Sequence, residues 1–123
     1  MSSGGIICEI EGRLPSLNEY IGACRKNRYE GAKMKRQTEQ LIWIYIRRLP
    51  KFTAPVTIHF HWVEENKKRD PDNVAAGKKF VLDALVEAGK LKDDGPKYVK
   101  GFVDTFEYGK TSKVVLTIRE EKQ

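Results

Sequence analysis

The chain has 123 residues, of which 40% are hydrophobic and 33% charged, a composition that predicts one soluble domain over residues 1–123 and excludes a disordered chain. The formal net charge of +6 favours a polyanionic partner, with nucleic acid as the first hypothesis. There is no apolar run long enough to span a membrane and no signal-peptide pattern, and Cys8 and Cys24 lack metal-site spacing, so we expect a reduced, cytoplasmic protein.

The first half of the chain predicts one strand followed by helices. Residues 1–5 are expected to form a flexible tail, and residues 6–10 a short strand. Ser16 and Glu19 have the spacing of a capping box, which indicates a helix start. A second helical run covers about residues 28–48 and ends before Pro50. Its apolar residues at 42–46 exceed what one helix face buries, which is a hint of an interface.

The second half predicts three strands and one long helix. Residues 56–62 alternate between apolar and polar, which puts His59 and His61 on the polar face; we interpret them as exposed positions rather than a metal pair. A helix is expected over 71–88, capped by Asp70 and ended by Gly89. Strands at 97–108 and 113–119 follow, joined by a turn. The order β-α-β-α-β-β predicts an α+β fold with helices on one face of a small mixed sheet.

Acidic residues mark both ends of the predicted helix. Asp70 and Asp72 stand at its start, and Asp93-Asp94 follows its end. At about 100° per residue, Asp72 and Lys79 share the face opposite the core stripe, whereas Lys78 lies nearer that stripe. A helix of about 17 residues is roughly 25 Å long. The two acidic clusters can therefore meet only if the chain reverses along the helix or a partner subunit contributes one of them.

A family resemblance is carried by the string from Arg69 to Gly101. Along the chain it contains, in order, Arg69-Asp70-Pro71-Asp72-Asn73, a helix lysine, Asp83-Ala84-Leu85, Ala88-Gly89 and Asp93-Asp94. This string resembles the RusA family of Holliday-junction resolvases, which phages and prophages carry. The resemblance implies a RusA-like fold and a homodimeric endodeoxyribonuclease that resolves four-way DNA junctions by symmetric cuts. The host would be a bacterial or phage-infected cell.

The resemblance also implies the site residues and the cofactor. Asp70, Asp72 and Asp94 would hold Mg²⁺ or Mn²⁺, with Asp93 as a possible substitute for Asp94. The essential lysine would be Lys79, with Lys78 as the alternative register. Hard divalent cations take oxygen ligands and activate water for phosphodiester hydrolysis, which suits three carboxylates. No small-molecule cofactor is expected.

Basic residues near the acids are the candidates for holding DNA phosphates. They are Lys67, Lys68, Arg69, Lys97, Lys100, Arg25 and Arg28. Two other functions fit the same composition. One is a non-catalytic basic phage accessory protein that binds branched DNA, in which the aspartates would be caps and turns. The other is a metal-dependent nuclease for forks or flaps.

Overall fold

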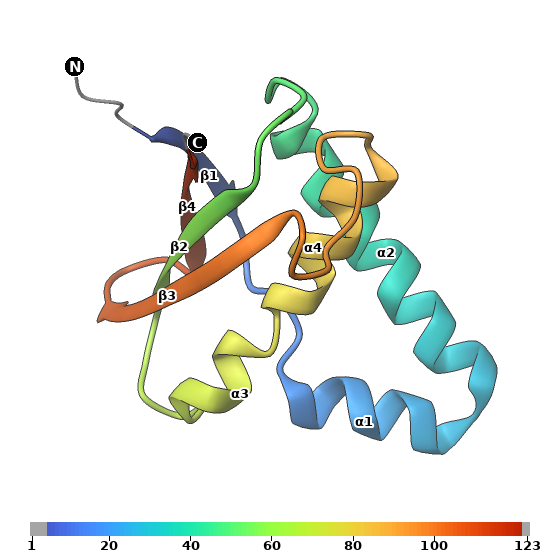
Figure 1. The fold of residues 1–123 in the computed structure, drawn as a ribbon. Coiled ribbons are helices and arrows are strands. Elements are labelled where there is room, and N and C mark those ends of the chain that lie inside the picture. Colours follow the sequence, from blue (N-terminus) through green and yellow to red (C-terminus); the bar gives the residue numbers. More distant parts are fainter. Residues whose placement is uncertain (1–4, 122–123) are drawn as a thin grey trace.

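Four strands and four helices make up residues 5–121, which are the residues that the computed structural model describes (Figure 1). The elements are β1 (Ile6–Glu11), α1 (Leu17–Lys26), α2 (Arg28–Ile46), β2 (Val56–Glu64), α3 (Pro71–Ala75), α4 (Lys78–Glu87), β3 (Val99–Tyr108) and β4 (Lys113–Glu120). The strands form one sheet in the order β1-β4-β2-β3, in which only the β2–β3 pair is parallel. The helices lie on one face of this mixed sheet, which confirms the predicted fold class.

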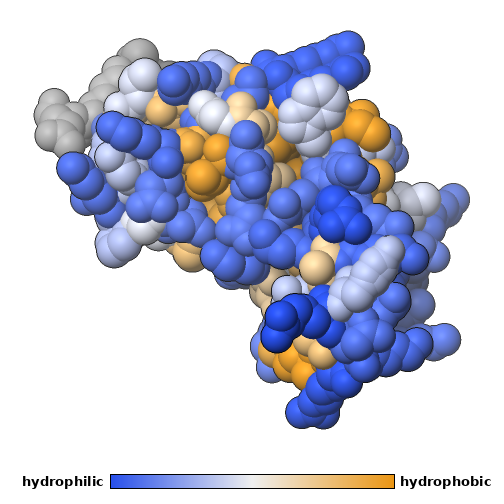
Figure 2. Space-filling view, turned by 90° about the vertical axis from the view of Figure 1, so that its right-hand side faces the viewer, coloured by the Kyte–Doolittle hydropathy of each residue, from blue (hydrophilic) through white to orange (hydrophobic). Residues whose placement is uncertain are grey.

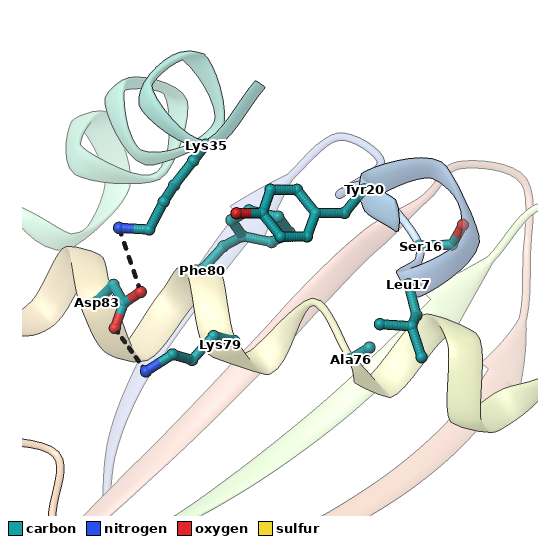
Figure 3. Close-up of a pocket in the computed structure, with 8 residues that line it drawn as sticks. All are labelled: Ser16, Leu17, Tyr20, Lys35, Ala76, Lys79, Phe80 and Asp83. Carbon is teal, nitrogen blue, oxygen red and sulfur yellow. Dashed lines mark ion pairs between the residues drawn. The ribbon is translucent and has the colours of Figure 1, made fainter. Parts of the chain in front are cut away.

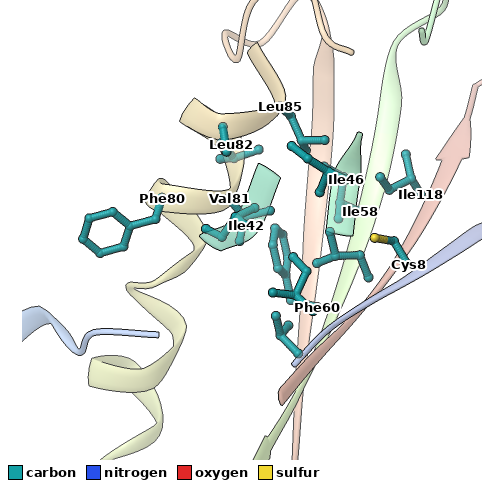
Figure 4. Close-up of a cluster of buried hydrophobic side chains, with 14 of the residues drawn as sticks. Cys8, Ile42, Ile46, Ile58, Phe60, Phe80, Val81, Leu82, Leu85 and Ile118 are labelled. Atoms are coloured by element: carbon teal, nitrogen blue, oxygen red, sulfur yellow. The ribbon is translucent and has the colours of Figure 1, made fainter. Parts of the chain in front are cut away.

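The alternation predicted for residues 56–62 is confirmed in the central strand β2. Val56, Ile58 and Phe60 are fully buried on the helix side of the sheet. They pack against Ile42 and Ile46 of α2 and against the apolar side of α4 (Figure 4). Because β2 lies between β4 and β3, its buried side chains are covered from both flanks, and the core forms over it.

The opposite face of β2 carries a hydrogen-bonded row of polar side chains. His59 Nε2 and His61 Nδ1 lie 2.7 and 2.6 Å from the hydroxyl oxygen of Thr105 on β3. His61 Nε2 lies 2.7 Å from Glu107 Oε1. The two histidines are half-buried, so they are more enclosed than the exposed positions that we expected.

The two helices expected before β2 are present as α1 and α2, whereas two helices, α3 and α4, replace the single one expected after β2; the observed order is β-α-α-β-α-α-β-β. The capping box is confirmed: the Ser16 hydroxyl accepts a hydrogen bond from the Glu19 N–H, and the Glu19 carboxylate accepts one from the Ser16 N–H. Asn27 separates α1 from α2 and caps α2 by accepting a hydrogen bond from the N–H of Glu30 at 2.8 Å. The helix expected over 28–48 ends at Ile46, two residues early.

The single helix predicted over 71–88 is wrong, because it is broken at Gly77. The Gly77 N–H bonds to the Val74 carbonyl, and the Phe80 N–H bonds to the Gly77 carbonyl, both at the three-residue spacing of a tighter turn. A β-carbon on Gly77 would lie 3.4 Å from the Leu14 β-carbon. The break therefore occurs where the chain passes closely under the segment before α1, a contact that local sequence does not reveal.

Two further expectations concern the chain's ends and membranes. Of the predicted tail at residues 1–5, only Gly5 is described, and it lies close to Thr117 of β4. Within residues 5–121 no helix combines the length and the apolar character that crossing a bilayer requires.

Candidate functional site

The segment from Gly89 to Tyr98 reverses the chain along α4 (Figure 1). Gly89 has a positive φ of 74°, and the N–H of Lys90 bonds to the Leu85 carbonyl, which closes the helix end. The chain then returns toward the start of α4, where Asp94 Oδ2 accepts a hydrogen bond from Lys79 Nζ at 3.2 Å. The chain thus reverses along α4, which is one of the two arrangements that would let the acidic clusters meet, but the contact formed joins Asp94 to Lys79 and not to Asp70 or Asp72.

Lys79 belongs to a continuous row of alternating charges. Its ammonium contacts Asp83 Oδ1 at 3.1 Å as well as Asp94. Lys35 of α2 contacts the other Asp83 oxygen at 3.4 Å and Glu39 at 2.9 Å. The hydrogen bonds that Lys79 donates to Asp83 and Asp94 raise the pKa of Lys79, and the hydrogen bond that Lys35 donates to the Glu39 carboxylate is the main cause of the raised pKa of Lys35. Both ammonium groups are therefore fully charged at neutral pH.

Lys78 points to a different partner. Its ammonium binds Asp104 of β3 at 2.5 Å and lies over the rings of Phe60 and Phe102. Asp104 Oδ1 also accepts a hydrogen bond from the Trp62 indole N–H at 2.9 Å. Lys78 thus links α4 to the sheet, and the side chains of Lys78 and Asp83 are only 22% and 18% exposed.

Sequence reasoning missed Asp104. It stands in register with Phe60 of β2, on the side of β3 that faces the helices. The available signal was its spacing of two residues from Phe102 and Phe106, because residues at that spacing share one face of a strand.

Asp70 and Asp72 present their carboxylates at the start of α3. Asp70 is the extended residue before the helix, and its side chain makes no capping hydrogen bond. Asp72 is exposed, and its Oδ1 accepts a hydrogen bond from the N–H of Asn73 at 3.0 Å. Neither carboxylate forms a salt bridge within residues 5–121. These two carboxylates are available to a ligand.

The three expected metal ligands do not form one cluster within a single chain. Among residues 5–121, no three His, Cys, Asp or Glu side chains lie together so that they could hold a metal ion. Asp94 is engaged by Lys79, whereas Asp70 and Asp72 stand at the start of α3. The donor type fits Mg²⁺, which usually takes one or two carboxylates together with water and substrate phosphates. Among residues 5–121, Asp70 and Asp72 are thus the expected ligands whose carboxylates form no salt bridge, whereas Asp94 is held by Lys79.

Arg69 is not free to hold DNA, contrary to expectation. Its guanidinium forms two hydrogen bonds with the Glu64 carboxylate, at 2.9 and 2.7 Å, and a third with the Leu14 carbonyl. The Arg69 side chain is only 13% exposed. This residue joins the loop before α3 to β2 and to the segment before α1.

The other expected DNA-binding residues are exposed. Lys67 and Lys68 lie in the loop before α3, and Arg25 and Arg28 lie where α1 meets α2. Both regions are at the lower end of the molecule in Figure 1. Lys97 lies before β3, with its ammonium 5.8 Å from the centre of the Tyr98 ring. Exposed cations in these positions can contact phosphates without rearrangement of the fold.

A scan against models of known protein families and a search of curated proteins found no match to this chain.

Proposed function

We propose that this chain is a RusA-like, metal-dependent endodeoxyribonuclease that cuts branched DNA, with the four-way junction as its substrate. The observation that supports this most directly is the contact between Asp94 and Lys79. These two residues are fifteen positions apart, and the resemblance to the RusA family implies a place in the catalytic site for both. The spatial expectation was that Asp94 would meet Asp70 and Asp72; the fold-back after Gly89 brings Asp94 to Lys79 instead.

In this proposal each residue has a chemical task. Asp70 and Asp72 hold a divalent cation, which supplies charge neutralisation and an activated water when bound. Lys79 keeps its proton, because two carboxylates raise its pKa. Its ammonium therefore stabilises the negative charge that builds on the phosphate during cleavage. Asp94 orients this ammonium, since its Oδ2 is one of the two acceptors that hold it.

A second copy of the chain would complete the enzyme. Symmetric cutting of two opposed strands requires two active sites, which a twofold dimer supplies. On α2, Leu41 and Ile44 are exposed on one side of the helix, while Ile42 and Ile46 are buried. Figure 2 shows the face that carries α2, with apolar patches among hydrophilic side chains. The substitution Ile44→Lys should shift the protein toward monomer in sedimentation velocity; an unchanged oligomeric state would exclude this helix from the interface.

The test of the proposed function uses a synthetic four-way junction. Asp72→Asn should bind the junction in EDTA with no loss of affinity relative to the unmodified protein, because the substitution removes one negative charge near the phosphates. The same variant should lose Mg²⁺-dependent cleavage by at least about a hundredfold. Glu11→Gln is the matched control, since Glu11 is an exposed acid at the end of β1.

Two results would reject the proposal. Full cleavage by Asp72→Asn would remove the metal role of this residue. Junction binding by the unmodified protein without any cleavage in Mg²⁺ or Mn²⁺ would favour the non-catalytic binding protein instead. Comparison of junction, fork, flap and linear duplex in the same assay identifies the preferred substrate.

A further inference from the structure

A cavity of about 250 Å³ lies between α1 and α4 (Figure 3). Its apolar walls are Leu17 and Tyr20 of α1, Ala76, and Phe80 of α4. The Tyr20 and Phe80 rings meet edge to face with centroids 5.3 Å apart. Sites for drug-sized ligands occupy roughly 300–1,000 Å³, so this cavity suits a smaller ligand, such as a single planar ring system.

The polar side of the cavity is built around the carboxylate of Asp83. Lys35 Nζ lies 3.4 Å from Asp83 Oδ2, and Lys79 Nζ lies 3.1 Å from Asp83 Oδ1 (Figure 3). An ionised carboxylate only accepts hydrogen bonds, and each of its oxygens has a further lone pair available. The cavity thus offers an apolar slot, an acceptor at its wall and two cations beside it. A planar heterocycle that carries N–H donors and is attached to a phosphate matches all three features.

We propose that this cavity receives one unstacked base of the branched DNA and favours bases with an exocyclic amino group over thymine. This inference rests on the proposed function for the identity of the DNA. Lys79 bridges Asp83 to Asp94, so a base in the cavity lies one side chain from the candidate catalytic site. Extracting a base costs least where it is already unpaired, as at a branch point. The carboxylate of Asp83 accepts from the amino group of cytosine, adenine or guanine, whereas thymine has no such amino group.

The direct test needs neither metal nor cleavage. Deoxycytidine monophosphate and thymidine monophosphate are titrated into the ¹⁵N-labelled protein in EDTA, and the amide signals of Leu17, Tyr20 and Asp83 are followed by NMR. Deoxycytidine monophosphate should move these signals, with an apparent affinity at least about fivefold higher than that of thymidine monophosphate. Equal affinities, or no movement of these signals with either nucleotide, would overturn the proposal.

Two variants separate the cavity from general charge effects. Leu17→Trp fills the cavity from its exposed rim and should abolish the NMR response, while Ile7→Trp, on β1 and away from the cavity lining, should leave it unchanged; these side chains are 44% and 69% exposed. Asp83→Asn should reduce the nucleotide preference to within about twofold, because an amide presents both an acceptor and a donor. Loss of the response in Ile7→Trp, or an unchanged response in folded Leu17→Trp, contradicts the assignment.

Failure of this inference is distinguishable from failure of the proposed function. A protein that cuts junctions but shows no nucleotide response at these amides keeps its nuclease function and loses the base-binding cavity. A protein that binds deoxycytidine monophosphate in the cavity but does not cut junctions loses the nuclease function alone.

Discussion

The neighbouring lysines of α4 should respond in opposite ways to removal. Lys78→Ala should destabilise the fold and preserve the chemistry, whereas Lys79→Ala should preserve the fold and damage the chemistry. The reason is their surroundings: the Lys78 side chain is 22% exposed and the Lys79 side chain is 68% exposed. A comparison of cleavage by the two variants therefore identifies the lysine that belongs to the proposed catalytic site.

The magnitudes follow from the partners of each lysine. Exposed ion pairs contribute about 0.2–1 kcal/mol, and removal of one partner from a fully buried pair costs about 3–5 kcal/mol. The pair between Lys78 and Asp104 lies between these limits, because the Asp104 side chain is 24% exposed. Loss of the contacts with the two phenylalanine rings adds about 0.5–1 kcal/mol. We expect Lys78→Ala to cost about 2 kcal/mol, and Lys79→Ala about 0.5 kcal/mol or less.

Urea denaturation, monitored by tryptophan fluorescence, measures the loss of folding free energy in both variants. For a slope of about 1.5 kcal/mol per molar urea, Lys78→Ala should lower the midpoint by more than about 1 M and Lys79→Ala by about 0.3 M. Lys110→Ala is the control for removal of an exposed lysine. Junction cleavage, assayed where all variants are folded, should fall about a hundredfold in Lys79→Ala only. Greater destabilisation by Lys79→Ala, or loss of cleavage in Lys78→Ala alone, would refute the reasoning.

Two further predictions concern the helices before β2. Gly31→Ala should destabilise the protein by about 1–3 kcal/mol in the same urea assay, because the added carbon would lie 2.6 Å from Cys24 Sγ and 3.2 Å from its backbone. Gly22→Ala meets nothing within 4 Å and should instead stabilise α1 by about 0.5–1 kcal/mol; the opposite order would refute the close packing of the two helices. Burial alone would raise the pKa of Glu19, but hydrogen bonds from the backbone N–H of Ser16 and other donors lower it below the ordinary value of 4.5. The stability from Glu19 is therefore present above pH 4.5 and lost as the pH falls below it, so Glu19→Gln should narrow the difference in melting temperature between pH 6 and pH 3.

Local patterns predicted the parts of the fold that depend on local physics. The alternation of β2 identified its buried side because a strand turns alternate residues to opposite faces. The capping box and Gly89 marked helix ends because these residues satisfy backbone groups directly beside them. The helical period of about 100° per residue also placed Lys78 nearer the core and Lys79 on the outer side of α4. Their side chains are 22% and 68% exposed, in agreement with this placement.

The remaining features depend on contacts between distant segments. The break at Gly77 lies close to Leu14, which is 63 positions earlier in the chain. The sequence around Arg69 favours a phosphate ligand, whereas in the fold its guanidinium is held by Glu64 and the Leu14 carbonyl. The expected meeting of three carboxylates is not formed within one chain, because the fold-back brings Asp94 to Lys79 instead.

The position of Asp104 has a consequence for solubility. It lies on β3, an edge strand whose outer backbone groups have no partner strand within residues 5–121. An inward-facing charge on an edge strand makes sheet-to-sheet association unfavourable, because an incoming strand would bury that charge. An apolar replacement of the Lys78–Asp104 pair, such as Lys78→Met with Asp104→Leu, would therefore leave β3 more open to aggregation.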